Sequence, residues 1–437
     1  MASDDKSPPR FQYQPLHDPE RQIRLVKLSP ESKNGVIQCS LRHAELNSKH
    51  VALSYVWGPP EPTRDILIDG KTFNIRDNLW QFLSHECQKR RSRKCSYWID
   101  QISINQEDTI EKNHQVYIMG TIYKSAIQVF VWLGDWDEEI LRAMTGAAMH
   151  PVNAVFWWWL KLRSALHRMI SSYEDTRQVY MARVNHYLDH YFEHWTSGLP
   201  IHLGCLLELN PYWRRAWTTP EFLLARDLKI ISGKCEMGLE LFDRVYHYAP
   251  SYLAIDEDSL AVSAYIQSAQ QQRRKNRRRA KKLVSPLTLS DLLRLFQGAP
   301  RKCEKQTDTI YSLLCLVEGE SLVKPDYSKD PNTLHLEVFI YEWDPTCGWD
   351  RDWGPRVFSD LLACSLNLDA HRAWHKLLKY LGIGRFSRYP NLGPYYVGVE
   401  AIHEEDRLFR ESINQAVIKA KALLVREHGI TASRDSR

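Results

Sequence analysis

One carboxylate in the sequence is placed where a catalytic group would be. Glu221 follows Pro220 in the segment Trp217-Thr218-Thr219-Pro220-Glu221. Proline suits the first position of a helix and Thr219 suits the capping position before it, so Glu221 is predicted in the first helical turn. The helix dipole favours an ionised carboxylate there, which fits an electrostatic or basic role better than an acidic one. The alternative to a catalytic role is that Glu221 only stabilises the N-terminal end of its helix.

Further candidate residues follow the strands of a predicted sheet. The apolar run 51–56 stops at Gly58-Pro59-Pro60 and predicts a buried strand, and a second strand is predicted over 97–104. Ligands of open parallel sheets bind beyond the carboxyl ends of the strands. The candidate substrate-binding residues are therefore Ser54, Tyr55, Trp57, Gly58, Asp100, Asn105 and Arg215.

Alternating strands and helices must position these residues. Along the first third of the chain, the predicted order of strand, helix, strand, helix and strand is 51–56, 79–90, 97–104, 111–126 and 128–133. This order predicts an α/β fold with a parallel sheet and helices on both faces. Asp69-Gly70 predicts a tight hairpin turn. Asp77 or Asn78 is expected to cap the first helix, and Asp108 or Thr109 the second.

Several stretches give the sequence a family resemblance. They are Val51-Ala52-Leu53-Ser54-Tyr55-Val56-Trp57-Gly58, the stretch from Tyr97 to Asp108 with Glu111-Lys112-Asn113-His114-Gln115-Val116, and Arg215 to Glu221. They resemble the motifs ALSYxWG, WIDxxxINQxD with ER/EK-x-x-QV, and R-x-W-x-x-Q-E of the fungal heterokaryon incompatibility (HET) domain. Residues 307–314 resemble a fourth motif of the family less closely. The resemblance covers roughly residues 11–330. It implies a protein that triggers cell death after recognition of a non-self or stress state.

The resemblance also implies a chemistry. The HET domain is similar to the Toll/interleukin-receptor (TIR) fold, a flavodoxin-like parallel sheet, and TIR enzymes that consume NAD carry a Glu at W-x-x-E spacing. By this resemblance Glu221 is the catalytic residue, here in a W-x-x-x-E arrangement, and Pro220 replaces the Gln that usually precedes it. Cleavage of the nicotinamide–ribose bond builds positive charge on the ribose carbon, which a nearby carboxylate stabilises, as in glycoside hydrolysis.

The other candidate residues have two interpretations each. Tyr55 or Trp57 can stack on a base or a nicotinamide ring, or can be a core aromatic residue. Arg215 can contact a diphosphate or form a structural ion pair. Asp100 can contact a ligand or brace a turn. Neither G-x-G-x-x-G nor G-x-x-x-x-G-K-[ST] occurs, so the motifs of a Rossmann oxidoreductase and of a P-loop NTPase are absent. NAD would be a consumed substrate, which requires neither motif, and no cofactor is expected.

A non-catalytic protein is the rival interpretation. Such a module would self-associate as a homo-oligomer or bind an activating protein partner, and death would follow from partner recruitment. Replacing Glu221 by Gln separates the two interpretations, because only the enzyme needs the carboxylate.

Composition limits the classes of protein. The net charge of +5 over 437 residues gives too little reason to expect nucleic-acid binding. Nine scattered cysteines without a C-x-x-C pair indicate reduced thiols and no zinc module. The polar N-terminus and the lack of an apolar run of about 18 residues predict a cytoplasmic protein without a transmembrane segment.

Two polar segments offer weaker signals. The run 273–282 has eight basic residues in ten, which suits a nuclear-localisation signal, an anionic-lipid contact, a nucleic-acid patch or simply a solvated loop. His186, His190 and His194 share a helical face, but a polar stripe is favoured over metal binding, so no metal site is predicted.

The predicted organisation has three parts. A polar tail covers 1–20, and the HET domain covers 21–330 with a helical insertion at 137–210 and a basic segment at 271–285. A helical C-terminal region covers 331–437.

Overall fold

The computed structural model describes most of the predicted sheet and several helices. The described residues are 8–29, 36–135, 210–239, 288–295, 301–317, 323–343, 355–383 and 400–427. Most of the predicted insertion, the basic run 273–282 and the three histidines of the 186–194 stretch lie outside these ranges. Their predictions therefore stay predictions, as does the division into domains.

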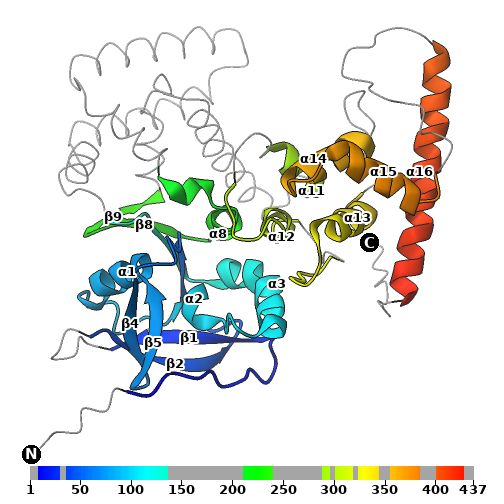
Figure 1. Ribbon diagram of the computed structural model, residues 1–437. Coiled ribbons are helices and arrows are strands. Elements are labelled where there is room, and N and C mark those ends of the chain that lie inside the picture. Colours follow the sequence, from blue (N-terminus) through cyan, green and yellow to red (C-terminus); the bar gives the residue numbers. More distant parts are fainter. Residues whose placement is uncertain are drawn as a thin grey trace, which may run out of the picture.

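A single mixed sheet forms the centre of the fold (Figure 1). Its strands are β1 (Gln22–Leu28), β2 (Gln38–Glu45), β3 (Val51–Tyr55), β4 (Thr63–Ile68), β5 (Lys71–Arg76), β6 (Tyr97–Trp98), β7 (Gln128–Trp132), β8 (Leu228–Ser232) and β9 (Cys235–Gly238). They lie in the order β5-β4-β2-β1-β6-β3-β7-β8-β9.

The prediction of a parallel sheet is correct only for the centre. Strands β6, β3, β7 and β8 are parallel neighbours. The pairs β1–β2, β1–β6, β4–β5 and β8–β9 are antiparallel, and β2–β4 is parallel. Short turns join β4 to β5 and β8 to β9, and a tight turn can only connect antiparallel strands. The sheet is therefore mixed.

Helices cover both faces of the sheet, as predicted. Helix α1 (Asp77–Cys87) packs on one face together with the side chains of Leu53 and Tyr55. Helices α3 (Thr109–Ser125) and α8 (Thr218–Leu224) pack on the other face. Side chains alternate along a strand, so neighbouring residues of β3 serve different cores.

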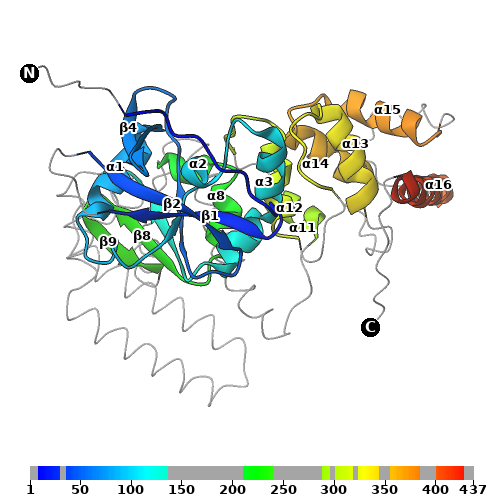
Figure 2. The ribbon, with the colours of Figure 1, turned by 90° about the horizontal axis from the view of Figure 1, so that it is seen from below.

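Further helices extend the α3 and α8 side. They are the 3-10 helix η1 (Pro211–Arg214), α11 (Leu289–Leu295), α12 (Asp308–Leu314), α13 (Pro331–Glu342), α14 (Pro355–Ser365), α15 (Ala370–Tyr380) and α16 (Glu400–Glu427). Figures 1 and 2 show that α13 to α16 gather at one end of the molecule, beyond α3 and α12. Among the helices that the structure describes, none is long and apolar enough to cross a membrane.

The second predicted strand is wrong in its length. Strand β6 ends at Trp98, and residues Asp100–Ser103 form the short helix α2. The amides of Ile102 and Ser103 donate to the carbonyl of Ile99 at 2.9 and 2.7 Å, which closes a helical turn. A short apolar run suits a buried strand and a buried helix equally, and here the helix forms. Asp100 consequently begins a helix instead of continuing the sheet.

The predicted turn and one of the two predicted caps are confirmed. Asp69 and Gly70 have φ values of 49° and 75°, as a two-residue hairpin turn requires. The Asp108 carboxylate accepts from the amides at the start of α3. Helix α1, in contrast, begins without a side-chain cap, so neither Asp77 nor Asn78 has that role.

The helix motif of α3 fixes the N-terminal segment to the sheet. Arg24 of β1 forms a bidentate ion pair with Glu111, with N–O distances of 2.6 and 2.8 Å. Arg24 also donates to the carbonyl of Gln14, and Glu111 accepts from the amide of Asn105. Gln115 donates to the carbonyl of Gln22. The motif residues Glu111 and Gln115 are therefore structural.

A segment from late in the chain completes the domain. The amide of Lys302 donates to the carbonyl of Arg214, and the amide of Ala216 donates back to the carbonyl of Lys302 at 3.0 Å. Helix α12 continues from this segment and packs against α8. Close packing also joins α12 to α3, since a Cβ added at Gly120 would lie 3.2 Å from Cys315. Residues 301–317 thus belong to the same body as the sheet.

Candidate functional site

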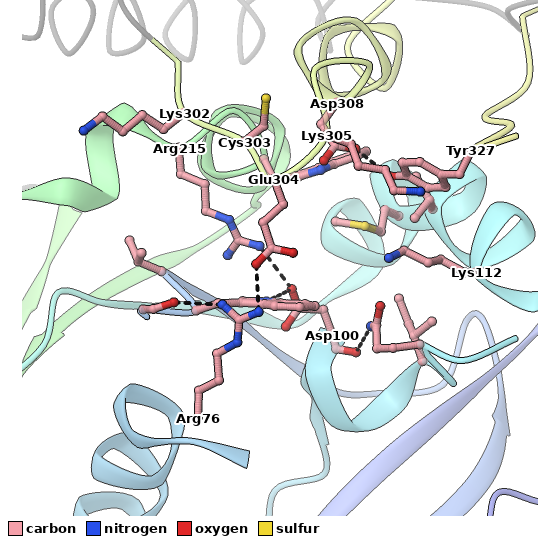
Figure 3. A pocket seen from close by; sticks show the side chains of 18 of the residues that line it. Arg76, Asp100, Lys112, Arg215, Lys302, Cys303, Glu304, Lys305, Asp308 and Tyr327 are labelled. Atoms are coloured by element: carbon pink, nitrogen blue, oxygen red, sulfur yellow. Dashed lines mark hydrogen bonds and ion pairs between the residues drawn. The ribbon is translucent and has the colours of Figure 1, made fainter. Parts of the chain in front are cut away.

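A pocket of about 330 Å³ opens beyond the carboxyl ends of β3 and β6. This volume is at the small end of the range for ligand sites, about 300–1,000 Å³. Its lining comes from residues 56–58, Asp100, α3, residues 211–217 and residues 302–308. In Figure 3 Asp100 lies on one side, called the floor here, and Lys302 and Cys303 lie on the opposite side. Five cationic and three acidic side chains line it. Such a lining favours an anionic ligand.

Asp100 holds the centre of the pocket floor. Its Oδ2 accepts a hydrogen bond from Trp57 Nε1 at 2.7 Å and lies 3.7 Å from Nη2 of Arg215. Its Oδ1 accepts from the amide of Gln101 at 2.7 Å. The carboxylate is therefore fixed by an indole, a guanidinium group and the first turn of α2.

Two guanidinium groups lie against the Trp57 ring. The Cζ atoms of Arg76 and Arg215 are 5.0 and 5.5 Å from the ring centroid, within the range of cation–π attraction. In Figure 3 Arg76 enters from the side of α1 and Arg215 from the opposite side. A ligand ring that stacks on Trp57 must compete with these groups.

Arg215 connects the pocket floor to the protein interior. Its Nη1 donates to the carbonyl of Tyr55, and its side chain is 17% exposed. Burial alone would lower the pKa of Arg215, but the charges of Asp100 and Glu221 outweigh burial and raise it. Arg215 is thus a fixed cation that interacts with both carboxyl groups.

Glu221 lies behind the pocket. Its residue exposure is 1%, and it does not line the pocket. Its Oε2 accepts from Ser54 Oγ at 2.5 Å, and Ser54 Oγ lies 2.7 Å from the Tyr212 hydroxyl. Ser54 comes from β3 and Tyr212 from η1, so Glu221 joins three elements in the interior.

Burial opposes the ionisation of Glu221 that its helix position favours. Burial raises the pKa of Glu221 from 4.5 to about 8, although the charge of Arg215 and the hydrogen bonds of Ser54 and Tyr123 act in the opposite direction. Loss of water outweighs a helix dipole, which contributes only about 0.3–1 kcal/mol at exposed positions. The helix also begins earlier than predicted, at Thr218, and Trp217 is the residue before it. Thr219 is therefore inside the helix and does not cap it.

Comparison with known proteins gives this region a family. Residues 50–221 match the family model described as Heterokaryon incompatibility protein (HET). This stretch is a heterokaryon incompatibility domain. A Neurospora crassa relative, Heterokaryon incompatibility protein 6, OR allele, is 29% identical over 262 residues, which are 52% of this chain and 36% of the relative. The match thus spans little more than a third of the relative's length. No solved structure matches the chain.

The predicted site residues of the HET domain fall into two groups. Those that line the pocket are Trp57, Gly58, Asp100 and Arg215. Those that do not line it are Ser54, Tyr55, Asn105 and Glu221. The catalytic role predicted for Glu221 and the binding roles of the others stay predictions.

Local geometry explains why the second group lies away from the pocket. Ser54 faces Glu221 on the α8 side of the sheet, and Tyr55 points into the α1 core with an exposure of 1%. Asn105 braces the α2–α3 loop: its amide donates to Glu111 at 2.8 Å and its side chain accepts from the amide of Glu107 at 3.3 Å.

Several pocket residues of the folded HET domain were not predicted from the sequence. Asp308 lies within the stretch 307–314 that resembles the fourth family motif, and Lys112 lies within the helix motif. The sequence therefore marked these two positions but did not indicate that their side chains line a pocket. No sequence motif marked the other pocket residues Arg76, Lys305 and Tyr327. They reach the pocket only because distant segments fold together.

The described residues offer no cluster for a metal ion. Among them, no three His, Cys, Asp or Glu side chains come close enough to share one. The seven cysteines in the described ranges form no disulfide with one another.

Proposed function

We propose that this chain is a heterokaryon-incompatibility-type cell-death effector whose HET domain hydrolyses NAD at the nicotinamide–ribose bond. The match of residues 50–221 to the family model and the relative named as an incompatibility protein support the biological role. One observation carries the chemistry: the buried carboxylate of Asp100 faces a cationic, aromatic pocket.

The order of the central strands supports a TIR-like, flavodoxin-like arrangement. In chain order β3, β6, β7 and β8 are the first to fourth parallel strands, and they lie in the order second, first, third, fourth. This is the order of flavodoxin-like sheets, whose ligands bind where the chain switches direction, beyond the strand ends. The pocket adjoins the end of β3, which is one of the two strands at that point.

The proposed reaction uses a carboxylate at the ribose. Water adds to the anomeric carbon as the bond to the nicotinamide nitrogen breaks, which yields ADP-ribose, nicotinamide and a proton. Positive charge on the ribose develops before water adds, and a fixed carboxylate in a dry site stabilises it. Asp100 lines the pocket, and in this proposal its carboxylate makes the contact.

Glu221 has a different place in the proposal. Its carboxyl group does not line the pocket, and of its two neighbours Ser54 and Arg215 only Arg215 does. We therefore assign Glu221 the position of a second carboxyl group, which holds Ser54 behind the pocket and does not contact substrate. This modifies the sequence-based expectation that Glu221 contacts substrate.

The non-catalytic alternative has its own supporting observation. Glu221 is buried and hydrogen-bonded in the manner of a structural residue, and Pro220 stands where the family usually has Gln. In that alternative the HET domain self-associates or binds an activating partner, and no bond in NAD is broken.

Nicotinamide release from NAD by the purified protein tests the proposal. We would compare wild type, Asp100→Asn and Glu221→Gln at high protein concentration, with Asp65→Asn, an exposed carboxylate of β4, as the matched control. The proposal expects release by wild type and the control, and loss in Asp100→Asn. Absence of release from wild type, together with cell death that persists in Asp100→Asn, would establish the non-catalytic alternative.

A further inference from the structure

The cations of the pocket are not equally neutralised. Arg76 forms an ion pair with Glu304, with Nη2 and Oε1 2.8 Å apart. Arg215 has the carboxylate of Asp100. Lys302 extends away from the other labelled cations in Figure 3. Arg76 and Arg215 thus already have their anions.

Two lysines line the opposite end of the pocket. The Nζ atoms of Lys112 and Lys305 lie 5.2 and 4.6 Å from the centroid of the Tyr327 ring. Within the described part of the chain, neither lysine forms an ion pair. Figure 3 shows that both side chains reach the same end of the pocket, beside Tyr327.

The surroundings hold this end of the pocket rigid. Tyr327 donates its hydroxyl hydrogen to Asp308 Oδ1 at 2.6 Å, and its amide donates to Asn113 at 3.3 Å. Asp308 is itself buried, with an exposure of 8%. The Tyr327 ring is therefore held in place by these hydrogen bonds, and the ammonium groups of the two lysines lie near its face.

The two lysines also oppose each other electrostatically. Burial lowers the pKa of Lys112; the negative charge of Asp308 acts against burial, and the positive charge of Lys305 lowers the pKa further. Two like charges that converge in a partly buried site destabilise each other unless an anion lies between them. An anion placed between the two ammonium groups would relieve this repulsion.

We propose that Lys112 and Lys305 form a phosphate subsite at the Tyr327 end of the pocket. This rests on the proposed function, because it assigns this end to the diphosphate of the substrate and the Asp100 end to the ribose. Lysine binds phosphate as a mobile point charge, and the Tyr327 ring gives both ammonium groups a cation–π contact when no ligand is present.

Inorganic pyrophosphate is the simplest probe of this subsite. We would titrate it, and in parallel ADP-ribose, into wild type, Lys112→Met and Lys305→Met by isothermal titration calorimetry. Methionine keeps the apolar stem and removes the charge. Hydrogen bonds to charged groups contribute about 1.5–3 kcal/mol, so each substitution is expected to weaken binding of both probes at least tenfold.

Two further variants control the experiment. Lys112→Arg keeps the charge and should keep most of the affinity. Lys124→Met removes an exposed lysine from the same helix, outside the pocket, and should bind as wild type does. Equal affinity in wild type and both methionine variants, or no pyrophosphate binding by wild type, would overturn the subsite.

The outcomes separate the subsite from the NAD chemistry. Pyrophosphate binding that depends on both lysines, without nicotinamide release, would support the phosphate subsite and rule out the proposed NAD hydrolysis. If nicotinamide is released and the KM for NAD is the same in wild type, Lys112→Met and Lys305→Met, the phosphate subsite is ruled out and the proposed hydrolysis still stands.

Discussion

Replacing Glu221 with Gln should change how the stability of the protein depends on pH. The pKa of Glu221 is about 8 in the folded protein and 4.5 when the group is in water. The protonated form is thus favoured by folding. Stability from this group is fully present below pH 4.5 and is lost as pH rises toward 8, because the unfolded chain releases its proton first.

The magnitude follows from the pKa difference. It spans about three and a half pH units, and each unit corresponds to about 1.4 kcal/mol. The full penalty for an ionised Glu221 is therefore about 4 to 5 kcal/mol above pH 8. Between pH 5 and 8, wild type should lose about 3 to 4 kcal/mol relative to Glu221→Gln, whose amide does not titrate.

Urea denaturation at several pH values measures this difference. Wild type and Glu221→Gln would be unfolded at pH 5, 6, 7 and 8, with Glu45→Gln as a control for removal of an exposed carboxyl group. The reasoning is refuted if the free energies of unfolding of wild type and Glu221→Gln run parallel from pH 5 to 8. Glu221 would then be ionised at neutral pH, as the sequence first indicated.

Three other substitutions test separate features. Glu111→Gln leaves the Arg24 guanidinium buried without its anion and should cost about 3–5 kcal/mol of unfolding free energy in urea, which the added change Arg24→Met should partly restore; a cost below about 1 kcal/mol would contradict a buried ion pair. Burial opposes the ionised form of Glu236, but hydrogen bonds from Arg91 and Lys89 prevail and lower its pKa to about 2. The stabilisation from ionised Glu236 is present above pH 4.5 and is lost as pH falls toward 2. Acid unfolding followed by circular dichroism should therefore be less steep in Glu236→Gln than in wild type. An identical acid transition in the two proteins would contradict a stabilising interaction of Glu236 with Arg91 and Lys89. Gly58 has a φ of 78°, so Gly58→Ala should lower the unfolding free energy by about 1–2 kcal/mol, whereas no loss would mean that this turn relaxes.

Patterns that depend on neighbouring residues were predictable from the sequence. The Asp69-Gly70 turn, the Asp108 cap and the buried run of β3 each depend on a few adjacent side chains, and each is present. The stretch after Trp98 was not predictable in this way, since its apolar spacing suits a strand as well as a helix.

The site was predictable only in part, for a physical reason. Trp57 and Asp100 follow strand ends, so the rule for ligand sites in parallel sheets located them. The burial of Glu221 depends on Tyr212, Tyr123 and the packing of α8, which no local pattern encodes. Sequence patterns indicate the helix position of a carboxyl group, but its ionisation depends on the water that the folded chain removes.

The docking of Lys302 beside Arg214 and Ala216 has a consequence for the limits of the folding unit. The family match ends at residue 221, before β8, β9 and α12, and begins after β1 and β2. A fragment cut to residues 50–221 would leave β6 and β7 each without one neighbouring strand and would remove one wall of the pocket. The stretch that matches the family model is therefore shorter than the folded unit that contains it. A fragment cut at its borders would expose unpaired strand edges, which are prone to association.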